Sequence, residues 1–362
     1  MQTSDESKQS DISTLSIPEQ LYAAGISPDS CLAQISRISG VDNIPGADLV
    51  QCYTLAGWKC VARKNEFKEG DLAVYIKIGS ILDPTVSHFS FLEGKPLKTK
   101  KIRGVVSQGL IGPLSWLSSG TDNQEFKEND DVTTILKIRK YQEKEELTSL
   151  GSGSVQRPSF IPKTDADRVQ NLSANDWNAL IGKTAYVTRK EDGTSTTYFY
   201  NEEKFGITSR NCLIDMTDTG RSVFHYLEMA RQFQIREKMQ HLKRNIAIQG
   251  EIVGPGINGN RLKLTALDFR VFGVWDITEG KYLPPTEVDS LCKELKLNQV
   301  PHIVTVQLSA KEANAAYWLS LADTLQYGFN IRAEGLVLRT YDGNIEMRFK
   351  AISNSYLLKH NL

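Results

Sequence analysis

The stretch Val187-Thr188-Arg189-Lys190-Glu191-Asp192-Gly193-Thr194-Ser195 organises the C-terminal half of the chain. One β-like run, residues 184–189, leads into Lys190, and a second, residues 194–200, follows the Asp-Gly pair. Asp-Gly between two strand patterns is the strongest short-range hairpin signal, so the sequence predicts a β-hairpin here. A solvated hairpin lysine and a reactive lysine presented by the turn both fit this pattern. Residues further along the chain must distinguish them.

The composition is that of an ordinary globular protein. A length of 362 residues, 40% of them hydrophobic and 24% charged, predicts roughly two or three domains, each with its own core. Because the formal net charge is +0, a nucleic-acid site would have to be a local basic patch. The five cysteines are widely spaced and form no C-x-x-C pair, which predicts free thiols in a reducing compartment.

We find no targeting or membrane signal in the sequence. No run approaches the roughly 18 apolar residues of a membrane span, and the N-terminus lacks the apolar core of a signal peptide. We therefore expect an intracellular, cytoplasmic protein without membrane association. Residues 1–28 are rich in Ser, Asp, Gln and Glu, with little to bury, and are predicted to be a disordered tail.

Residues 29–138 carry short β-like runs separated by turn residues, namely 32–38, 49–55, 58–62, 72–78 and 102–114. About five short strands over such a length suit a small closed barrel, so we expect an OB-like nucleic-acid-binding domain. Within it, no acid interrupts a basic run that would neutralise RNA phosphates, formed by Lys95, Lys98, Lys100, Lys101 and Arg103. A solvated edge strand that resists aggregation is the alternative explanation of this run.

A change in composition predicts a linker at 139–157, where a charged run is followed by Gly151-Ser152-Gly153-Ser154. The remainder, 158–362, is predicted to be an α+β domain of antiparallel sheets with helices. Its expected helices are 221–244, 287–295 and one that a Ser309/Glu312 capping box opens and that ends near Gly328. A second hairpin is expected around residues 342–344.

Six short motifs follow one another in this domain: Lys190-x-Asp192-Gly193, Ser209-Arg210-Asn211, Gly250-Glu251, Phe269-Arg270-Val271-Phe272, Glu334-Gly335-Leu336-Val337 and Arg348-Phe349-Lys350. Each is weak alone, but the ordered set resembles the nucleotidyltransferase motifs of the covalent polynucleotide ligase and capping-enzyme superfamily. The run 160–171, with Gly254-Pro255-Gly256, resembles the RNA ligase 2 branch. An OB-like domain before the transferase domain is similar to the RNA ligase type built in that order.

This resemblance implies an ATP-dependent enzyme that uses Lys190 as its nucleophile. In such ligases the lysine amine attacks the α-phosphate of ATP and forms a lysyl-AMP phosphoramidate. A free lysine has a pKa near ~10.4, so a neutral amine at pH 7 costs about 4.6 kcal/mol. We expect Arg189 and a bound divalent metal, Mg or Mn, to supply the positive field that lowers this cost. Phe272 should stack on adenine, with Phe269 or Trp275 as alternatives and core packing as the competing role of each.

The resemblance also assigns roles to three carboxylates and to Gly193, which belongs to the nucleotide site. Asp192 and Glu251 are implied to lie near the nucleotide ribose and the water shell of the metal. Glu334 is implied to hold further metal waters. Hard divalent ions that keep several waters favour oxygen ligands of this kind.

Several basic residues complete the expected site. Arg348 and Lys350 alternate on a strand and therefore face one side, where both can reach phosphate oxygens. The family usually has lysine at the first position, so the planar and longer Arg348 is a departure. By the same resemblance, Arg210 contacts RNA or the ribose, and Lys163 and Arg168 bind the β- and γ-phosphates or the 5′-phosphate. Surface ion pairs are the alternative for Lys163 and Arg168.

The register of the second hairpin decides which side chains share a face. A two-residue Asp342-Gly343 loop would place Arg348 opposite Val337. A three-residue Asp342-Gly343-Asn344 loop would pair Arg348 with Leu338 and send Glu334, Arg348 and Lys350 to one side. We predict the second register, or a bulge at Gly335.

Together these inferences predict an ATP-dependent RNA ligase that joins RNA 3′-OH and 5′-phosphate ends, in RNA repair. Lys190 would take AMP from ATP and pass it to an RNA 5′-phosphate, and the neighbouring 3′-OH would then displace it. We expect a monomer whose partners are RNA and ATP. A DNA ligase or a capping enzyme carries an OB domain after the last motif, whereas only 12 residues follow Lys350. An inactive nucleic-acid-binding homologue is the alternative outside the enzymes.

Overall fold

The computed structural model describes residues 31–55, 57–117, 125–141, 155–342 and 345–362. They form two compact units. The first comprises the described residues up to Tyr141 and Leu172–Ala179, and the second comprises the described residues of 155–171 and 180–362. The predicted tail of residues 1–28, the Gly-Ser part of the linker and residues 343–344 lie outside the described residues. No described helix is long and apolar enough to cross a membrane.

The first unit is built on a five-stranded antiparallel sheet in the order β3-β2-β1-β4-β8. β1 (Ala33–Asn43) pairs with β4 (Leu72–Ile76) and then, after a bulge at Ser39, with β2 (Val50–Leu55). β3 (Trp58–Arg63) and β8 (Leu110–Gly112) are the outer strands. The amide of Gln108 donates to the carbonyl of Lys59 across 2.7 Å, which brings the two outer strands together. This nearly closed barrel confirms the predicted OB-like fold.

Smaller elements complete the first unit. They are β5 (Ser80–Ile81), the 3-10 turns η3 (Ser90–Leu92) and η4 (Leu114–Leu117), the β6 (Lys100–Ile102) and β7 (Val105–Ser107) pair, and β9 (Arg139–Lys140). Because β9 pairs with β5, the first two residues of the expected linker belong to this unit. Trp58, Phe67 and Tyr75 are buried in its core, so they are not exposed for stacking on bases.

The basic run lies on the outside of this unit. Lys100 and Lys101 are exposed on β6, and Arg103 is exposed in the turn that follows it. Lys95 forms an ion pair with Glu93, two residues upstream, at 2.5 Å, and both side chains are well exposed. The run therefore offers a solvated positive surface, and its use for RNA stays a prediction.

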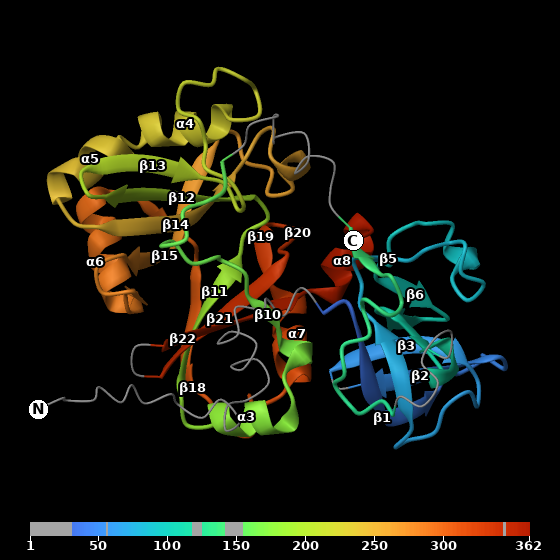
Figure 1. Ribbon diagram of the computed structural model, residues 1–362. Helices are drawn as coiled ribbons and strands as arrows, with labels where there is room; N and C mark the ends of the chain where they lie inside the picture. Colours follow the sequence, from blue (N-terminus) through green and yellow to red (C-terminus); the bar gives the residue numbers. More distant parts are fainter. Residues whose placement is uncertain (1–30, 56, 118–124, 142–154, 343–344) are drawn as a thin grey trace, which may run out of the picture. The chain divides into compact units, whose positions relative to one another are not determined.

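The second unit contains two sheets, which Figure 1 shows one above the other. The first has the order β10-β22-β21-β11-β18, and the second β13-β12-β14-β15-β16 with β17 beside β15. The first sheet consists of β10 (Asp167–Arg168), β11 (Thr184–Lys190), β18 (His302–Gln307), β21 (Gly335–Asp342) and β22 (Ile345–Ile352). The second consists of β12 (Thr194–Asn201), β13 (Lys204–Thr208), β14 (Ile246–Val253), β15 (Asp268–Asp276), β16 (Lys281–Tyr282) and β17 (Asn298–Gln299).

The hairpin predicted around Lys190 is wrong. β11 pairs with β21 and β18, whereas β12 pairs with β13 and β14. Residues 191–193 therefore carry the chain from one sheet to the other instead of closing a turn. The Asp-Gly signal located a real change of direction, but long-range pairing decided the partners of each strand.

Three helices pack their buried side chains against one face of the second sheet: α4 (Phe224–Gln232), α5 (Ile235–Leu242) and α6 (Pro285–Leu295). The single helix expected over 221–244 is wrong, because Gln234 takes a left-handed conformation (φ 51°) and separates α4 from α5. The helix expected over 287–295 is confirmed by α6, with Val288, Leu291, Cys292 and Leu295 buried. The shared core fixes this sheet as a rigid wall.

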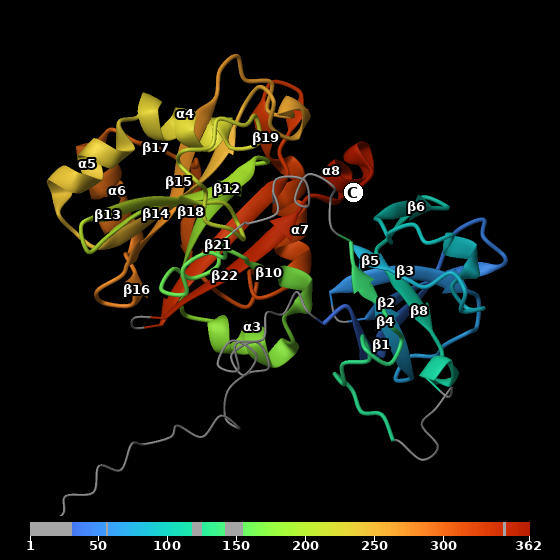
Figure 2. The ribbon, with the colours of Figure 1, turned by 45° about the horizontal axis from the view of Figure 1, so that its top comes forward.

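The first sheet is backed by α7 (Ala315–Thr324), which lies along β21 and β22 in Figure 2. Ser309 and Glu312 form only one of the two bonds of a capping box, in which the Ser309 amide donates to Glu312 Oε2 at 3.1 Å. The helix begins later, where the Asn314 side chain caps it by accepting from the Tyr317 amide at 2.8 Å. The helix ends at Thr324, because a short hairpin follows. That hairpin joins β19 (Gln326–Gly328) to β20 (Ile331–Arg332).

The remaining helical segments are η5 (Val169–Asn171), η6 (Asn258–Asn260), α8 (Asn354–His360) and α3 (Ala174–Leu180). Most of α3 groups with the first unit. The side chain of Ser353 caps α8 by accepting from the Tyr356 amide at 3.0 Å.

The predicted register of the β21–β22 hairpin is also wrong. Arg348 pairs with Arg339, and the ladder runs without a shift from Asp342 and Ile345 to Gly335 and Ile352. The three-residue loop would require Leu338 opposite Arg348, and no bulge occurs at Gly335. The connecting residues 343–344 themselves lie outside the described residues.

Candidate active site

A cavity of about 780 Å³ lies in the second unit, and residues of both sheets line it. The residues predicted for the site from motifs far apart in the sequence meet there: Lys190, Asp192, Gly193, Arg210, Glu251, Phe272, Glu334, Arg348 and Lys350. Lys163 and Arg168 do not line it, although the intervening residues 164–166 do. The cavity thus brings residues of the six ordered motifs together in one site.

Lys190 is the last residue of β11 and extends into this cavity. Its Nζ lies 2.8 Å from Glu334 Oε2, and the side chains of Lys190 and Glu334 are 26% and 18% exposed. Burial alone would lower the pKa of Lys190, but the carboxylates of Glu334, Glu251 and Asp192 outweigh it and raise the pKa. The protein's own groups therefore keep the amine charged, the opposite of what we expected from burial beside cations.

Arg189 does not supply the positive field that we expected at Lys190. Arg189 also lines the cavity, but its guanidinium is engaged by neighbouring groups of the protein. Its Nε donates to Glu191 at 2.7 Å, and its guanidinium lies over the Tyr327 ring at 5.0 Å. Glu191 also accepts from Arg270 at 2.9 Å, and Arg270 pairs with Asp268 at 2.8 Å.

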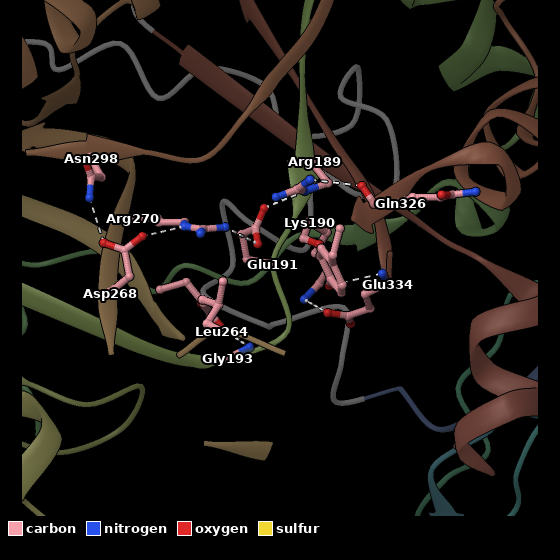
Figure 3. A network of polar contacts seen from close by, with 12 residues as sticks. Arg189, Lys190, Glu191, Gly193, Leu264, Asp268, Arg270, Asn298, Gln326 and Glu334 are labelled. Atoms are coloured by element: carbon pink, nitrogen blue, oxygen red, sulfur yellow. Dashed lines mark hydrogen bonds and ion pairs between the residues drawn. The ribbon is translucent and has the colours of Figure 1, made fainter. Parts of the chain in front are cut away.

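Figure 3 shows that this network runs along one side of the β11 end, with Lys190 and Glu334 on the other. Glu191 is 3% exposed, so its charge is balanced almost entirely by the two arginines. The sequence reasoning missed Glu191 and Arg270. In the sequence, Glu191 is marked only by its place next to Lys190. Arg270 is marked only by its place between the two phenylalanines of the 269–272 motif.

Gly193 allows the 191–193 crossover to pack closely against β14 beside the cavity. A Cβ at this position would lie 2.2 Å from the carbonyl oxygen of Ile252 and 2.8 Å from Cγ of Glu251. The Gly193 amide donates to Glu251 Oε1 at 3.2 Å, which orients that carboxylate toward Lys190. Burial raises the pKa of Glu251 to about 8; Lys190 opposes the shift, and Glu334 and Asp192 add to it.

Asp192 is held by three donors that the sequence did not predict. Its Oδ1 accepts from Asn258 at 2.9 Å, and its Oδ2 accepts from Arg261 at 2.8 Å and from the Tyr356 hydroxyl. The contacts come from the loop after β14 and from α8. They fix the 191–193 crossover and therefore the position of Lys190.

The carboxylates fit a hydrated divalent ion better than a directly ligated one. Among the described residues, no group of three or more His, Cys, Asp or Glu side chains is arranged to hold a metal directly. Glu251 and Glu334 nevertheless both line the cavity and both face the Lys190 ammonium. A divalent cation that enters together with a ligand and keeps several waters can be held by such oxygen acceptors through its water shell.

The position of Glu334 beside Lys190 does not result from the alternation of side chains along a strand. It immediately precedes β21, and the backbone of Gly335 passes so close to β22 that a Cβ would lie 2.0 Å from the carbonyl oxygen of Ala351. The Tyr327 hydroxyl donates to the Lys190 carbonyl at 2.9 Å and accepts from the Glu334 amide at 3.1 Å. Tyr327 thus ties the two charged partners together through their backbones.

Arg348 and Lys350 share a face of β22, as predicted, and both line the cavity. Arg348 is 8% exposed, its Nε donates to Glu346, and its guanidinium carbon lies 3.8 Å from the centre of the Tyr282 ring. Its Nη2 atom has no hydrogen-bond partner among the described residues. The Nε atom of this arginine is therefore committed to the fold, whereas its buried Nη2 atom is left unsatisfied by the described residues.

Phe272 is presented to the cavity by a β-bulge. On β14 and β15, Gln249 pairs with Gly273 and Gly250 with Val271, so Phe272 is the extra residue. It lines the cavity, whereas Phe269 is fully buried in the core. Trp275 donates its indole N–H to the Phe160 carbonyl at 3.0 Å and does not line the cavity. Of the three candidate aromatics, only Phe272 is placed to stack on a ligand.

Two more side chains border the cavity. Arg210 pairs with Asp165 at 2.5 Å and is 40% exposed, so it stands at the rim. His225 also lines the cavity, and burial lowers its pKa to about 4, which leaves its imidazole neutral at pH 7. The sequence predicted no catalytic role for His225, because its spacing is not that of a nucleophile or a metal ligand.

Family models match both parts of the chain. A model described as RNA ligase matches residues 183–352. A model described as an OB-fold domain matches residues 32–114. No curated protein sequence matches the chain significantly.

Solved structures are similar over nearly the whole chain. A Naegleria gruberi RNA ligase variant with AMP and Mn is 34% identical, with a TM-score of 0.80, and the match covers 91% of this chain and 99% of that one. A variant of the same enzyme with ATP and Mn is 34% identical at a TM-score of 0.81, again over 91% and 99% of the two chains. The enzyme with pyrophosphate is 35% identical at a TM-score of 0.80, over 91% and 99%.

Proposed function

This chain belongs to the RNA ligase family, and we propose that it joins RNA 3′-OH and 5′-phosphate ends through an adenylate carried on Lys190. The observation that carries the proposal is the convergence of Lys190, Glu251 and Glu334 on one cavity. ATP is the proposed nucleotide, because the similar Naegleria gruberi enzyme has structures with ATP and with AMP.

In the first step, the Lys190 amine attacks the α-phosphate of ATP, forms a P–N bond and expels pyrophosphate. Only the neutral amine is a nucleophile, and Glu334 is the nearest group that can hold the departing proton, 2.8 Å from Nζ. The buried network around Glu191 keeps the strand end in place during the reaction.

Glu251 and Glu334 are the proposed acceptors for the water shell of a divalent cation. Asp192, which lines the same cavity, is proposed to support them. Such a cation, Mg or Mn, would neutralise charge on the triphosphate and on the leaving pyrophosphate. The presence of Mn with nucleotide in the similar enzyme supports this assignment.

The remaining cavity residues bind and orient. Lys350 and the Nη2 atom of Arg348 are proposed to contact phosphate oxygens, and Phe272 to stack on adenine. Gly193 is proposed to act by letting the 191–193 crossover pack against β14 beside Glu251. Arg210 at the rim is proposed to contact the RNA end.

Further parts of the proposal lie outside the cavity. Lys163 and Arg168, close in sequence to its rim, are proposed to reach the outer phosphates or the RNA 5′-phosphate. The basic run of Lys95, Lys98, Lys100, Lys101 and Arg103 is proposed to bind RNA through phosphates. We further propose a monomer that acts in RNA repair in the cytoplasm, a location supported by five cysteines that are all free.

Sealing assays test this function. A 5′-labelled, 5′-phosphorylated RNA incubated with the full chain, ATP and Mg or Mn should be converted to longer or circular products that resist phosphatase. A DNA strand of the same sequence should be joined far less. Preferential joining of DNA would contradict the proposal and favour the DNA ligase alternative.

A further inference from the structure

A second cavity, of about 760 Å³, adjoins the first, and Asn258 lines both. Its walls come from the loop of residues 258–263, the β19–β20 hairpin and the end of α8. We call it the basic groove, because four of its lining residues are Arg261, Lys263, Arg332 and Lys359. None of the described lining residues is Asp or Glu, so the groove has one sign of charge.

Half of these charges are engaged by the fold and half are available. Arg261 pairs with Asp192 at 2.8 Å, and Arg332 donates to the Asp323 carbonyl. Lys263 and Lys359 are exposed, and neither forms an ion pair with a described residue. Uncompensated lysines in a concave surface create a positive potential that attracts polyanions.

The hairpin that forms one wall also carries an exposed aromatic ring. Phe329 is 91% exposed, although large apolar side chains are normally buried, and Asn330, the next residue, lines the groove. Tyr327 on the same hairpin bonds to the backbones of Lys190 and Glu334 at 2.9 and 3.1 Å. The hairpin that carries Phe329 is therefore tied to the backbone of the reacting lysine.

We propose that the basic groove binds the sugar–phosphate backbone of an RNA strand as its end enters the active site, with Phe329 stacking on a base. The proposal rests on the ligase function above. Lysines that neutralise phosphates and an aromatic ring that stacks on any base are the recurring elements of single-strand binding. Asn258 joins the groove to the nucleotide cavity, so a strand lying in it leads its end toward Lys190.

The basic groove is also connected to the 191–193 crossover. Arg261 lines the groove and holds Asp192, and Asn258 holds Asp192 and the Gly193 carbonyl at 2.9 and 2.8 Å. RNA phosphates that approach Arg261 therefore act on a group that positions the 191–193 crossover. The triphosphate of ATP is a second possible source of the same phosphate chemistry, and the test separates the two.

The test compares a Lys263→Ala/Lys359→Ala double variant with a Lys204→Ala/Lys293→Ala control, in which two exposed lysines outside both cavities are removed. Binding of a fluorescent single-stranded RNA is followed over a range of salt concentrations. The groove variant should bind roughly tenfold more weakly at low salt, and its log–log salt slope should fall by about 0.7 per lysine. The control should bind like the wild type, and the KM for ATP in self-adenylylation should not change in either.

Phe329 is tested by Phe329→Leu and Phe329→Trp. Leucine keeps the apolar area but removes stacking, so RNA affinity should fall by about fivefold or more, whereas tryptophan should preserve it. Because the side chain is exposed, neither change disturbs the core.

Two outcomes would overturn the groove assignment. RNA affinity and salt slope equal to those of the control would show that the strand lies elsewhere. A raised KM for ATP with intact RNA binding would assign the groove to the triphosphate. Both differ from failure of the ligase function itself, in which the wild type would neither self-adenylylate nor seal RNA.

Discussion

The two faces of the β11 end use charge in opposite ways. On the Arg189 face, Glu191 and Arg270 form ion pairs of 2.7 to 2.9 Å, and every charge is balanced within the protein. On the Lys190 face, Lys190 pairs with Glu334 at 2.8 Å, and both line an open cavity together with Glu251. Arg189 and Lys190, the residues that define the two faces, are neighbours in the sequence.

This difference separates structure from chemistry. A closed network gains nothing from a ligand, so its value is to hold the strand end rigidly. An open set in which burial raises the pKa of Glu251 to about 8 is electrostatically incomplete, and a nucleotide with its metal can complete it. Substitutions on the first face should therefore affect stability, and those on the second should affect catalysis.

The largest expected effect is on the open face. Glu334→Gln should lower the rate of self-adenylylation by roughly 10²-fold or more, because the charge that faces Lys190 and the metal waters is lost. Unfolding free energy should change by less than about 1 kcal/mol, since removing a carboxylate also relieves its repulsion with Glu251. Single-turnover kinetics and urea unfolding measure the two quantities. A large loss of stability in this variant would erase the contrast between the faces.

Glu191→Ala should show the reverse pattern. Removing this buried carboxylate leaves Arg189 and Arg270 without their shared partner, which should cost about 3–5 kcal/mol of unfolding free energy. Chemical denaturation measures the loss, and Glu228→Ala, which removes an ion pair with the exposed Arg231 on α4, is the matched control. A loss no greater than that of the control would mean that the network is not structural.

Phe272→Ala tests the apolar member of the open face. The ring lies on a bulge and lines the cavity, so its removal should raise the KM for ATP by about fivefold or more through lost stacking. Phe272→Trp should retain most of the affinity. Equal KM values for the alanine and tryptophan variants would move the adenine site elsewhere.

Arg348→Lys should have the smallest effect, because Arg348 both supports the fold, by stacking on Tyr282, and lines the cavity. Lysine keeps the positive charge beside the cavity but loses the planar stack on Tyr282, so stability should fall by about 1 kcal/mol. Self-adenylylation should persist, since lysine is the residue usual in the resembling family. Thermal unfolding and adenylylation rates measure both, and loss of activity with intact stability would assign Arg348 a specific phosphate contact.

The sequence predicted which residues meet, but not how they are held. Lys190, Glu251 and Glu334 could be found because short motifs carry them in a fixed order, and the structure brings them to one cavity. The partners of Asp192, by contrast, come from a loop and the final helix, and Asn258 and Tyr356 belong to none of the motifs. Only tertiary structure reveals such support.

The errors in the fold have a common physical cause. An Asp-Gly pair indicates that the chain turns, but pairing with distant strands decides whether β11 and β12 form a hairpin. Likewise, hydrophobic periodicity continued across 221–244, and the left-handed Gln234 that divides the helix leaves no signal of that kind. The β21–β22 register depended on residues 342–345, where either loop length suited the sequence.

The central claim is that Lys190 forms the covalent adenylate. The most direct measurement incubates the full chain with α-labelled ATP and a divalent metal, then separates the protein under denaturing conditions and maps the adduct by mass spectrometry. We predict one AMP on Lys190 in the wild type, acid-labile as a phosphoramidate is, and no label on Lys190→Ala, whose fold is kept by the opposite face. Label on another residue, or equal labelling of Lys190→Ala, would contradict the account.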